Sequence, residues 1–365
     1  MTQATTTAAP SSAVPQIDRE KLHEFMGKMI VDHGAAALGP LVILGDKLGL
    51  YKKLADHGPL SSIELAQRTD TRERYIREWL AAQAAAGYIT YDELSDKFSM
   101  SPEQAWAFAS EESPVFLAGG FHSLISIYTD EEKLEAAYRS GAGVDWGDHN
   151  GCLFCGTEKL FKTSYRAHLT EEWLPALDGA VEKLTAGATV ADVGCGHGAS
   201  TIIMAQRFPK SKFIGYDIHE PSIETARERA REAGVTNVTF EVASAQDFNG
   251  DQYDLICFFD CLHDMGDPVG AIANVRQALK EDGSLMIVEP FAHDNLTDNF
   301  NPLGRLYYAF SAQVCVPCSL AQNVGLGLGA QAGEKRIAEV VAQGGLSRFR
   351  RATETPLNLI FEARR

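Results

Sequence analysis

Apolar residues follow two different periods along the chain. In residues 18–110 they recur near helical spacing, which is typical of amphipathic helices, in a series formed by Ile30, Leu38, Leu41, Leu44, Leu48 and Leu50. From residue 188 onward, short apolar runs alternate with charged amphipathic segments. The pattern predicts a helical N-terminal part and a C-terminal part in which strands and helices alternate.

The N-terminal part shows the order of elements of a winged helix. Ser61 precedes Glu64 by three positions, which is a capping-box signal for a short helix. A second helix is expected over residues 72–86, before Gly87 as its C-cap, and two apolar segments then flank an acidic turn. We predict a disordered Thr/Ala/Ser/Pro-rich tail over residues 1–17 and a winged-helix-like domain over residues 18–112.

The C-terminal part, residues 181–365, predicts an α/β fold, specifically a Rossmann-like doubly wound domain with a parallel sheet and helices on both faces. The expected strands cover residues 189–193, 212–216, 238–242, 253–259 and 284–288, and two closing strands cover 347–353 and 358–364. Residues 113–180 connect the two domains. We expect this connector, together with residues 291–330, to form a lid and a pocket.

Net charge narrows the range of partners. The chain carries 33 Lys and Arg against 49 Asp and Glu, a formal charge of −16, which argues against nucleic acids and anionic membrane surfaces. The expected hairpin at residues 91–100 holds three acids and one lysine, whereas a DNA-binding wing is normally basic. We therefore expect a dimerisation or lid module, and the alternative is a ligand-sensing transcription regulator that binds DNA.

Two further absences bear on localisation. The chain has no run of about 18 apolar residues, the length needed to span a bilayer. Its first 18 residues contain neither a basic residue nor the apolar segment of a secretory signal. We expect a cytoplasmic protein that does not span a membrane.

A glycine-rich segment, Gly194–Gly198, follows the first strand of the C-terminal part, with Asp192 two positions before it. Glycines let the backbone turn sharply and approach a ligand, and the next helix points its first amides there. Asp217 ends the second strand, 19 residues after Gly198, near the spacing of about 20 expected for a ribose-binding carboxylate. The two acids favour a ligand with a ribose and a positive charge but no phosphate, which describes S-adenosylmethionine. A plain tight turn is the alternative.

The segment D-V-G-C-G-H-G, followed by Y-D-I and S-A-Q-D-F after the next two strands, resembles the class I S-adenosylmethionine-dependent methyltransferases over about residues 185–290. With the winged-helix-like N-terminus, the chain is similar to small-molecule O-methyltransferases that use such a domain to dimerise, so the resemblance implies a homodimer and a small-molecule acceptor. It implies a cofactor site formed by Asp192, Gly194, Cys195, Gly196, His197 and Gly198 at the methionine part, Asp217 at the ribose, Ile218, Ser244, Ala245 and Gln246 around the adenine, and Phe259 and Asp260 at the next strand end.

A histidine follows the strand that ends at Phe259. In plant O-methyltransferases a similar L/C-H-D-W segment places the general base, so the resemblance implies this role for His263, with Met265 in place of the Trp. The alternative is that His263 only packs near the cofactor. Oxygen is our first choice of acceptor atom, followed by sulfur or nitrogen. We expect three aromatic residues of the 291–330 segment to contact the acceptor, or else to pack in the core: Tyr307, Tyr308 and Phe310.

Four of the seven cysteines form two C-x-x-C pairs, Cys152 with Cys155 and Cys315 with Cys318. This spacing is that of a split four-cysteine site for zinc or another soft metal, and both pairs fall in segments assigned to the pocket. A redox pair or thiols that handle a sulfur-containing or otherwise soft substrate are a second interpretation. Buried or unrelated cysteines are the third.

Overall fold

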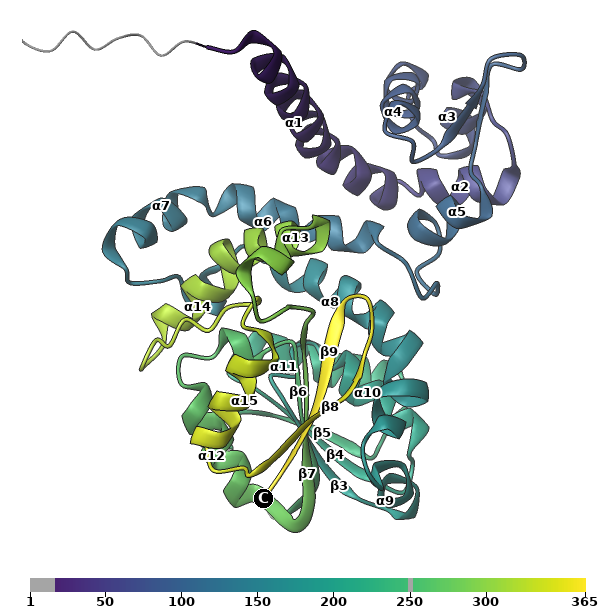
Figure 1. Cartoon of the computed structure of the whole chain (residues 1–365). Coiled ribbons are helices and arrows are strands. Elements are labelled where there is room, and N and C mark those ends of the chain that lie inside the picture. Colours follow the sequence, from purple (N-terminus) through teal and green to yellow (C-terminus); the bar gives the residue numbers. More distant parts are fainter. Residues whose placement is uncertain (1–16, 249–251) are drawn as a thin grey trace, which may run out of the picture.

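The computed structural model describes residues 17–248 and 252–365, so all but the last residue of the expected N-terminal tail lies outside the described residues. The N-terminal domain is helical and carries one small hairpin (Figure 1). Its elements are α1 (Arg19–Lys47), α2 (Leu50–His57), α3 (Ser62–Arg68), α4 (Glu73–Ala85), β1 (Thr90–Asp92), β2 (Lys97–Ser99) and α5 (Pro102–Phe108). This order confirms the predicted winged helix.

Local signals account for the shape of this domain. Ser61 accepts the N–H of Glu64 while the Glu64 side chain accepts the N–H of Ser61, so the predicted capping box starts α3. Helix α4 buries Trp79 and Leu80 against α1, and the Trp79 indole donates to the Leu41 carbonyl at 2.9 Å. The hairpin of β1 and β2 is antiparallel.

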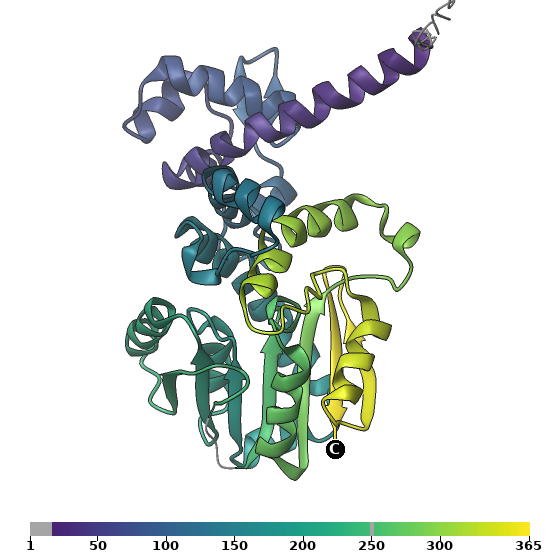
Figure 2. The same cartoon turned by 90° about the vertical axis from the view of Figure 1, so that its left-hand side faces the viewer.

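Helix α1 is much longer than the apolar spacing predicts, because it continues through Pro40 for 29 residues. Its N-terminal half projects away from the rest of the molecule (Figures 1 and 2). Among the described residues it is the one helix long and apolar enough to cross a membrane, judged by length and composition alone, and 28% of its most apolar window is buried. The sequence holds no uninterrupted apolar run of this length, and the helix passes this test because its apolar residues are separated by only a few charged positions.

A layer of helices separates the winged helix from the large sheet (Figure 1). The connector contributes α6 (Ser123–Thr129), α7 (Glu131–Ser140) and α8 (Cys152–Ser164), and the later insertion contributes α13 (Pro302–Phe310) and α14 (Val316–Ala321). The two segments are bonded to each other, since the Val144 N–H donates to the Pro317 carbonyl at 3.0 Å and the Tyr138 hydroxyl donates to the Ala312 carbonyl at 3.1 Å. Segments about 170 residues apart in sequence thus form one cover.

The C-terminal domain contains a seven-stranded sheet with the order β5-β4-β3-β6-β7-β9-β8. The strands are β3 (Thr189–Val193), β4 (Lys212–Asp217), β5 (Val238–Val242), β6 (Tyr253–Phe259), β7 (Leu279–Pro290), β8 (Arg348–Glu354) and β9 (Asn358–Arg364). The doubly wound fold is confirmed, but the sheet is mixed rather than parallel. Only three residues join β8 to β9, and a connection this short can pair strands only in the antiparallel sense.

Helices cover both faces of the sheet. Helices α12 (Pro268–Ala278) and α15 (Gly333–Gln343) pack with one set of buried strand residues, and α9 (Ala180–Ala186) and α10 (Ala199–Arg207) pack with the other. Helix α11 (Glu220–Glu232) packs against β5. This arrangement leaves the carboxyl ends of β3, β4 and β6 as the place where a ligand can bind beneath the cover.

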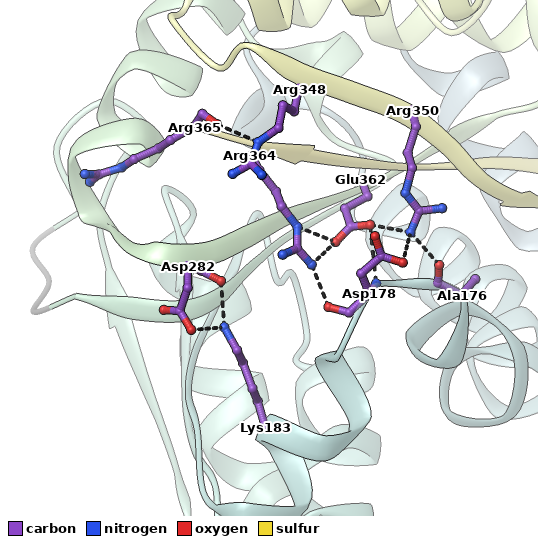
Figure 3. A network of polar contacts seen from close by, with 9 residues as sticks. All are labelled: Ala176, Asp178, Lys183, Asp282, Arg348, Arg350, Glu362, Arg364 and Arg365. Carbon is purple, nitrogen blue, oxygen red and sulfur yellow. Dashed lines mark hydrogen bonds and ion pairs between the residues drawn. The ribbon is translucent and has the colours of Figure 1, made fainter.

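The last strand is fastened to the connector by a polar network (Figure 3). Glu362 is 2% exposed, and its carboxylate pairs with the guanidinium groups of Arg350 and Arg364. Arg364 also donates to the Asp178 carbonyl, and Arg350 donates to the Ala176 carbonyl at 2.9 Å. The network holds the segment before α9 against β8 and β9.

Candidate active site

A cavity of about 780 Å³ lies at the carboxyl ends of β3, β4 and β6, below the helical cover. Most of the predicted cofactor residues line it: Gly194, Cys195, Gly196, His197, Asp217, Ile218, Ser244, Ala245, Gln246, Phe259 and Asp260. The structure therefore brings together segments spread over 67 residues of sequence. Two predicted residues, Asp192 and Gly198, are not among the lining residues.

The glycine loop turns because three of its residues adopt left-handed backbone angles, with φ of 77° at Gly194, 52° at Gly196 and 76° at Gly198. Close neighbours also leave no space for a side chain at two of these glycines. A Cβ at Gly194 would lie 2.8 Å from the Cys261 sulfur, and a Cβ at Gly198 would lie 2.7 Å from the Phe240 ring. Gly198 therefore serves the packing of the loop rather than the cavity wall.

Asp217 lies at the end of β4 and is 8% exposed. One carboxylate oxygen accepts the Gly196 N–H at 2.8 Å and the other accepts the His219 N–H at 2.9 Å. Burial raises the pKa of this carboxyl, against the effect of the two backbone hydrogen bonds. Since a carboxylate oxygen can accept two bonds, each keeps an acceptor position for a ligand hydroxyl.

Asp192 lies behind the loop rather than at the cavity wall. One of its oxygens accepts the hydroxyl groups of Ser200 and Thr201, both at 2.6 Å, and these residues belong to the first turn of α10. Burial raises the pKa of Asp192 to about 6. The predicted direct contact of Asp192 with a cationic ligand is thus corrected: its side chain fixes the start of α10, which in turn positions the loop.

Asp260, which follows β6, has a left-handed backbone angle (φ 50°) that non-glycine residues seldom adopt. Its carboxyl accepts the side-chain amide of Asn358 at 2.9 Å, and its second oxygen is buried without a hydrogen-bond partner among the described residues. Burial and the nearby Glu289 carboxylate raise its pKa well above the ordinary value. The strained backbone holds this carboxyl at the cavity wall.

His263 is 3% exposed and lies behind the cavity wall, which its neighbour Asp264 reaches. Its Nδ1 is 2.5 Å from a carboxylate oxygen of Glu289, and its Nε2 is 3.2 Å from one of Asp264. Burial alone would lower the pKa of His263, but the carboxylates of Asp264 and Glu289 outweigh burial and raise it well above the ordinary value. Sequence reasoning missed Glu289, although a polar residue at the end of a buried parallel strand is a signal for it.

The three aromatic residues predicted to contact the acceptor do not line the cavity. Tyr307 donates its hydroxyl to the Leu357 carbonyl at 2.9 Å, so it fastens α13 to the hairpin of β8 and β9. Tyr308 and Phe310 lie half-buried on the same helix. The packing alternative therefore holds for this helix, whose residues form part of the cover.

Aromatic residues of the connector form the opposite wall instead. Trp146, Phe154, Phe161 and Tyr165 line the cavity, as does Glu158, whose carboxylate pairs with both His197 and Arg229. The sequence predicts that the connector contributes to the pocket and shows that it is rich in aromatic residues. It does not indicate which of these residues line the cavity.

The two cysteine pairs do not form a common four-sulfur site. All four thiols are free; Cys155 is exposed on α8, whereas Cys315 and Cys318 are buried in the segment before and within α14. Among the described residues, the one His/Cys/Asp/Glu group close enough to share a cation joins Cys315 to His263 and Asp264. The predicted split zinc site is wrong, because α8 directs its cysteines elsewhere.

Comparisons with known proteins agree with the fold. Residues 184–344 match the methyltransferase domain family, and residues 36–109 match the Rv2258c-like winged HTH domain family. The chain therefore combines a methyltransferase domain with an N-terminal winged helix.

Individual relatives match only part of the chain. An uncharacterized methyltransferase of Bacillus subtilis is 32% identical over 32% of this chain, and a 2-heptyl-1-hydroxyquinolin-4(1H)-one methyltransferase of Mycobacteroides abscessus is 31% identical over 26%. The matches span 47% and 45% of those two proteins, less than half of each.

Similar solved structures cover nearly the whole chain. Human N-acetylserotonin methyltransferase in complex with SAM has a TM-score of 0.68 at 16% identity, covering 97% of this chain and 99% of that one. Mitomycin 7-O-methyltransferase has a TM-score of 0.64 at 19% identity, covering 95% and 99%. At such identities the likeness concerns the fold.

Proposed function

We propose that this protein transfers the methyl group of S-adenosylmethionine to a small-molecule acceptor, with oxygen as the first choice of acceptor atom and sulfur or nitrogen next. One observation carries the proposal: the glycine loop, Asp217 and the 243–246 segment line one cavity beneath a cover of aromatic residues. Methyl transfer to an already activated sulfonium requires mainly in-line positioning and exclusion of water. A covered cavity provides both.

The chain's own residues divide the cavity into two ends. At one end Asp217 and Ile218 would hold the ribose and adenine, under Phe154, whose ring centroid is 4.8 Å from that of His219. At the other end Tyr165 lies 5.3 Å from Phe259, centroid to centroid. We assign the second end to the acceptor, whose surroundings also include Asp264, Met265, Cys318 and Gln322.

The proton of the acceptor requires a place to go. Asp264 lines the cavity and its carboxylate lies against Nε2 of His263, which Glu289 holds from behind. We propose that the His263–Asp264 pair accepts this proton, with His263 as the general base in its neutral form, a form that its raised pKa shifts to higher pH. The Glu289 carboxylate stabilises the imidazolium that results.

We propose that the winged helix serves dimerisation. Its wing is acidic, with Asp92 forming hydrogen bonds within the turn, which does not favour a DNA-binding role. Helix α1 exposes large apolar side chains on its projecting half, including Phe25, Met29, Ile30 and Val31. A second copy of the chain would cover them. Static light scattering tests this: we expect twice the chain mass, and a monomer at micromolar concentration would contradict it.

Labelled S-adenosylmethionine and a panel of phenols, hydroxyquinolines, thiols and amines test the activity. We expect methylated product from an acceptor with an ionisable hydroxyl. His263→Ala should lower turnover more than tenfold and leave S-adenosylmethionine affinity unchanged, because His263 lies outside the cavity wall. Unchanged turnover in this variant would remove His263 from the mechanism, and tight binding of random duplex DNA would instead favour a regulator.

A further inference from the structure

Three chemically different side chains meet behind the acceptor end of the cavity. Nε2 of His263, a carboxylate oxygen of Asp264 and the sulfur of Cys315 all lie within 4.8 Å of one another. Two of these residues follow β6, and the third comes from the segment that leads into α14. Imidazole, carboxylate and thiolate together are a donor set that favours a borderline-soft divalent cation such as Zn²⁺.

The distance between the His263 and Asp264 ligand atoms suits a tetrahedral cation. Two ligand atoms at about 2.0–2.1 Å from zinc are about 3.3–3.4 Å apart when they subtend a tetrahedral angle. Nε2 of His263 and the nearest Asp264 oxygen are 3.2 Å apart. That Asp264 oxygen is buried and has no hydrogen-bond partner among the described residues. That oxygen therefore keeps an acceptor position that a cation would fill.

The imidazole is oriented as metal-binding histidines usually are. Glu289 is 4% exposed and holds Nδ1 of His263 at 2.5 Å, so Nε2 is directed at Asp264 and Cys315. A carboxylate on the far ring nitrogen fixes the tautomer in which Nε2 offers its lone pair. Ser319 donates to the Met265 carbonyl at 2.8 Å and joins α14 to the segment after β6. The group is thus held by its surroundings.

We propose that His263, Asp264 and Cys315 bind one Zn²⁺-like divalent cation, with water in the fourth position. Binding releases the thiol proton of Cys315 to solvent and uses the lone pair of His263 Nε2. The bound cation would occupy Nε2 of His263 and the Asp264 carboxylate, the pair to which the proposed function assigns proton acceptance. This consequence rests on the proposed function: a cation bound to His263 and Asp264 should inhibit methyl transfer, because the pair can then no longer accept the proton of the acceptor.

Cobalt binding to the full-length chain tests the site. After chelation and dialysis against Co²⁺ under reducing conditions, we expect one Co²⁺ per chain by elemental analysis and the absorption bands of a tetrahedral, thiolate-bound Co²⁺. Cys315→Ser should lose the thiolate band, and the matched variant Cys155→Ser should keep it, because Cys155 is exposed on α8 and outside the group. No Co²⁺ bound to the wild type, or an unchanged band in Cys315→Ser, would overturn the proposal.

Two measurements keep the test decisive. Binding of S-adenosylhomocysteine shows that each variant is folded. If Cys315→Ser does not fold, His263→Gln replaces it in the metal-binding test, and we expect this variant to lose the metal. Activity is measured with and without Zn²⁺, where we expect loss in the wild type and in Cys155→Ser but none in Cys315→Ser. Binding of Co²⁺ without inhibition by Zn²⁺ would support the cation site and overturn both its inhibitory consequence and the proton role of His263.

Discussion

Replacing Asp217 with asparagine should weaken binding of S-adenosylhomocysteine by about 10- to 150-fold. The carboxylate already accepts one N–H at each oxygen, from Gly196 and His219, and offers a further acceptor position on each side. A hydrogen bond from a ligand hydroxyl to a charged group contributes about 1.5–3 kcal/mol, and about 1.4 kcal/mol corresponds to a factor of ten in affinity. Loss of one such bond gives the stated range.

The same substitution also acts on the fold, and the assay has to separate the two effects. The amide nitrogen of asparagine must face either the Gly196 or the His219 N–H, so one buried donor loses its acceptor at a cost of about 1–3 kcal/mol. Titration calorimetry at a temperature where denaturant curves show the variant folded isolates the affinity.

Asp254→Asn is a matched control. Asp254 is a partly buried aspartate near the start of β6 that accepts the Thr189 N–H at 2.8 Å and pairs with Lys280. Because it is near the opposite end of the strand from the cavity, we expect wild-type affinity. An affinity of Asp217→Asn within a factor of two of wild type, or an equal loss in Asp254→Asn, would refute the assignment of Asp217 to the ribose.

Three further predictions concern stability. Burial raises the pKa of Asp192 from 3.8 to about 6, so the native state holds a proton that the unfolded state has lost between these pH values. The free energy of unfolding should therefore fall by up to about 3 kcal/mol as pH rises from 4 through 6. Urea curves at pH 4 and 7.5 should lack this fall in Asp192→Asn, and equal falls in the variant and the wild type would contradict the burial argument. Glu362→Ala should lower the free energy of unfolding by about 2–3 kcal/mol, because two arginines lose a buried partner. Removing Glu339 from its exposed pair with Arg336 should lower it by less than about 1 kcal/mol. Equal losses in the two variants, measured by denaturant unfolding, would count against the network. Gly198→Ala should lower the melting temperature and the affinity for S-adenosylhomocysteine, since its φ of 76° and the Phe240 ring 2.7 Å away both oppose a side chain; a variant as stable as wild type would contradict this.

Features with local causes could be predicted from the sequence. The strand before Gly194, the loop itself and Asp217 at the end of β4 follow from apolar runs, glycine positions and one spacing, and the structure brings them to one cavity. The capping box of Ser61 and Glu64 is likewise contained within four residues. In each case the interaction that decides the structure joins residues close in sequence or at the ends of neighbouring parallel strands.

The surroundings of the site could not be predicted in this way. Glu289 meets His263 across 26 residues, and Cys315 reaches the same group only because the insertion folds back over β6. The position of Tyr307 in the 291–330 segment predicts contact with the acceptor or packing in the core, and its hydroxyl donates to the Leu357 carbonyl, 50 residues away. Side-chain direction on a covering helix depends on how the helix docks, which its own apolar spacing does not determine.

Equilibrium dialysis of the full-length chain with labelled S-adenosylmethionine tests the central claim most directly. We expect saturable binding of one S-adenosylmethionine per chain, displaced by S-adenosylhomocysteine and not by NAD⁺, because Asp217 at the cavity wall is placed for a ribose and the Asp192 carboxyl behind the glycine loop disfavours a phosphate. No saturable binding, or displacement by NAD⁺ at equal concentration, would contradict it.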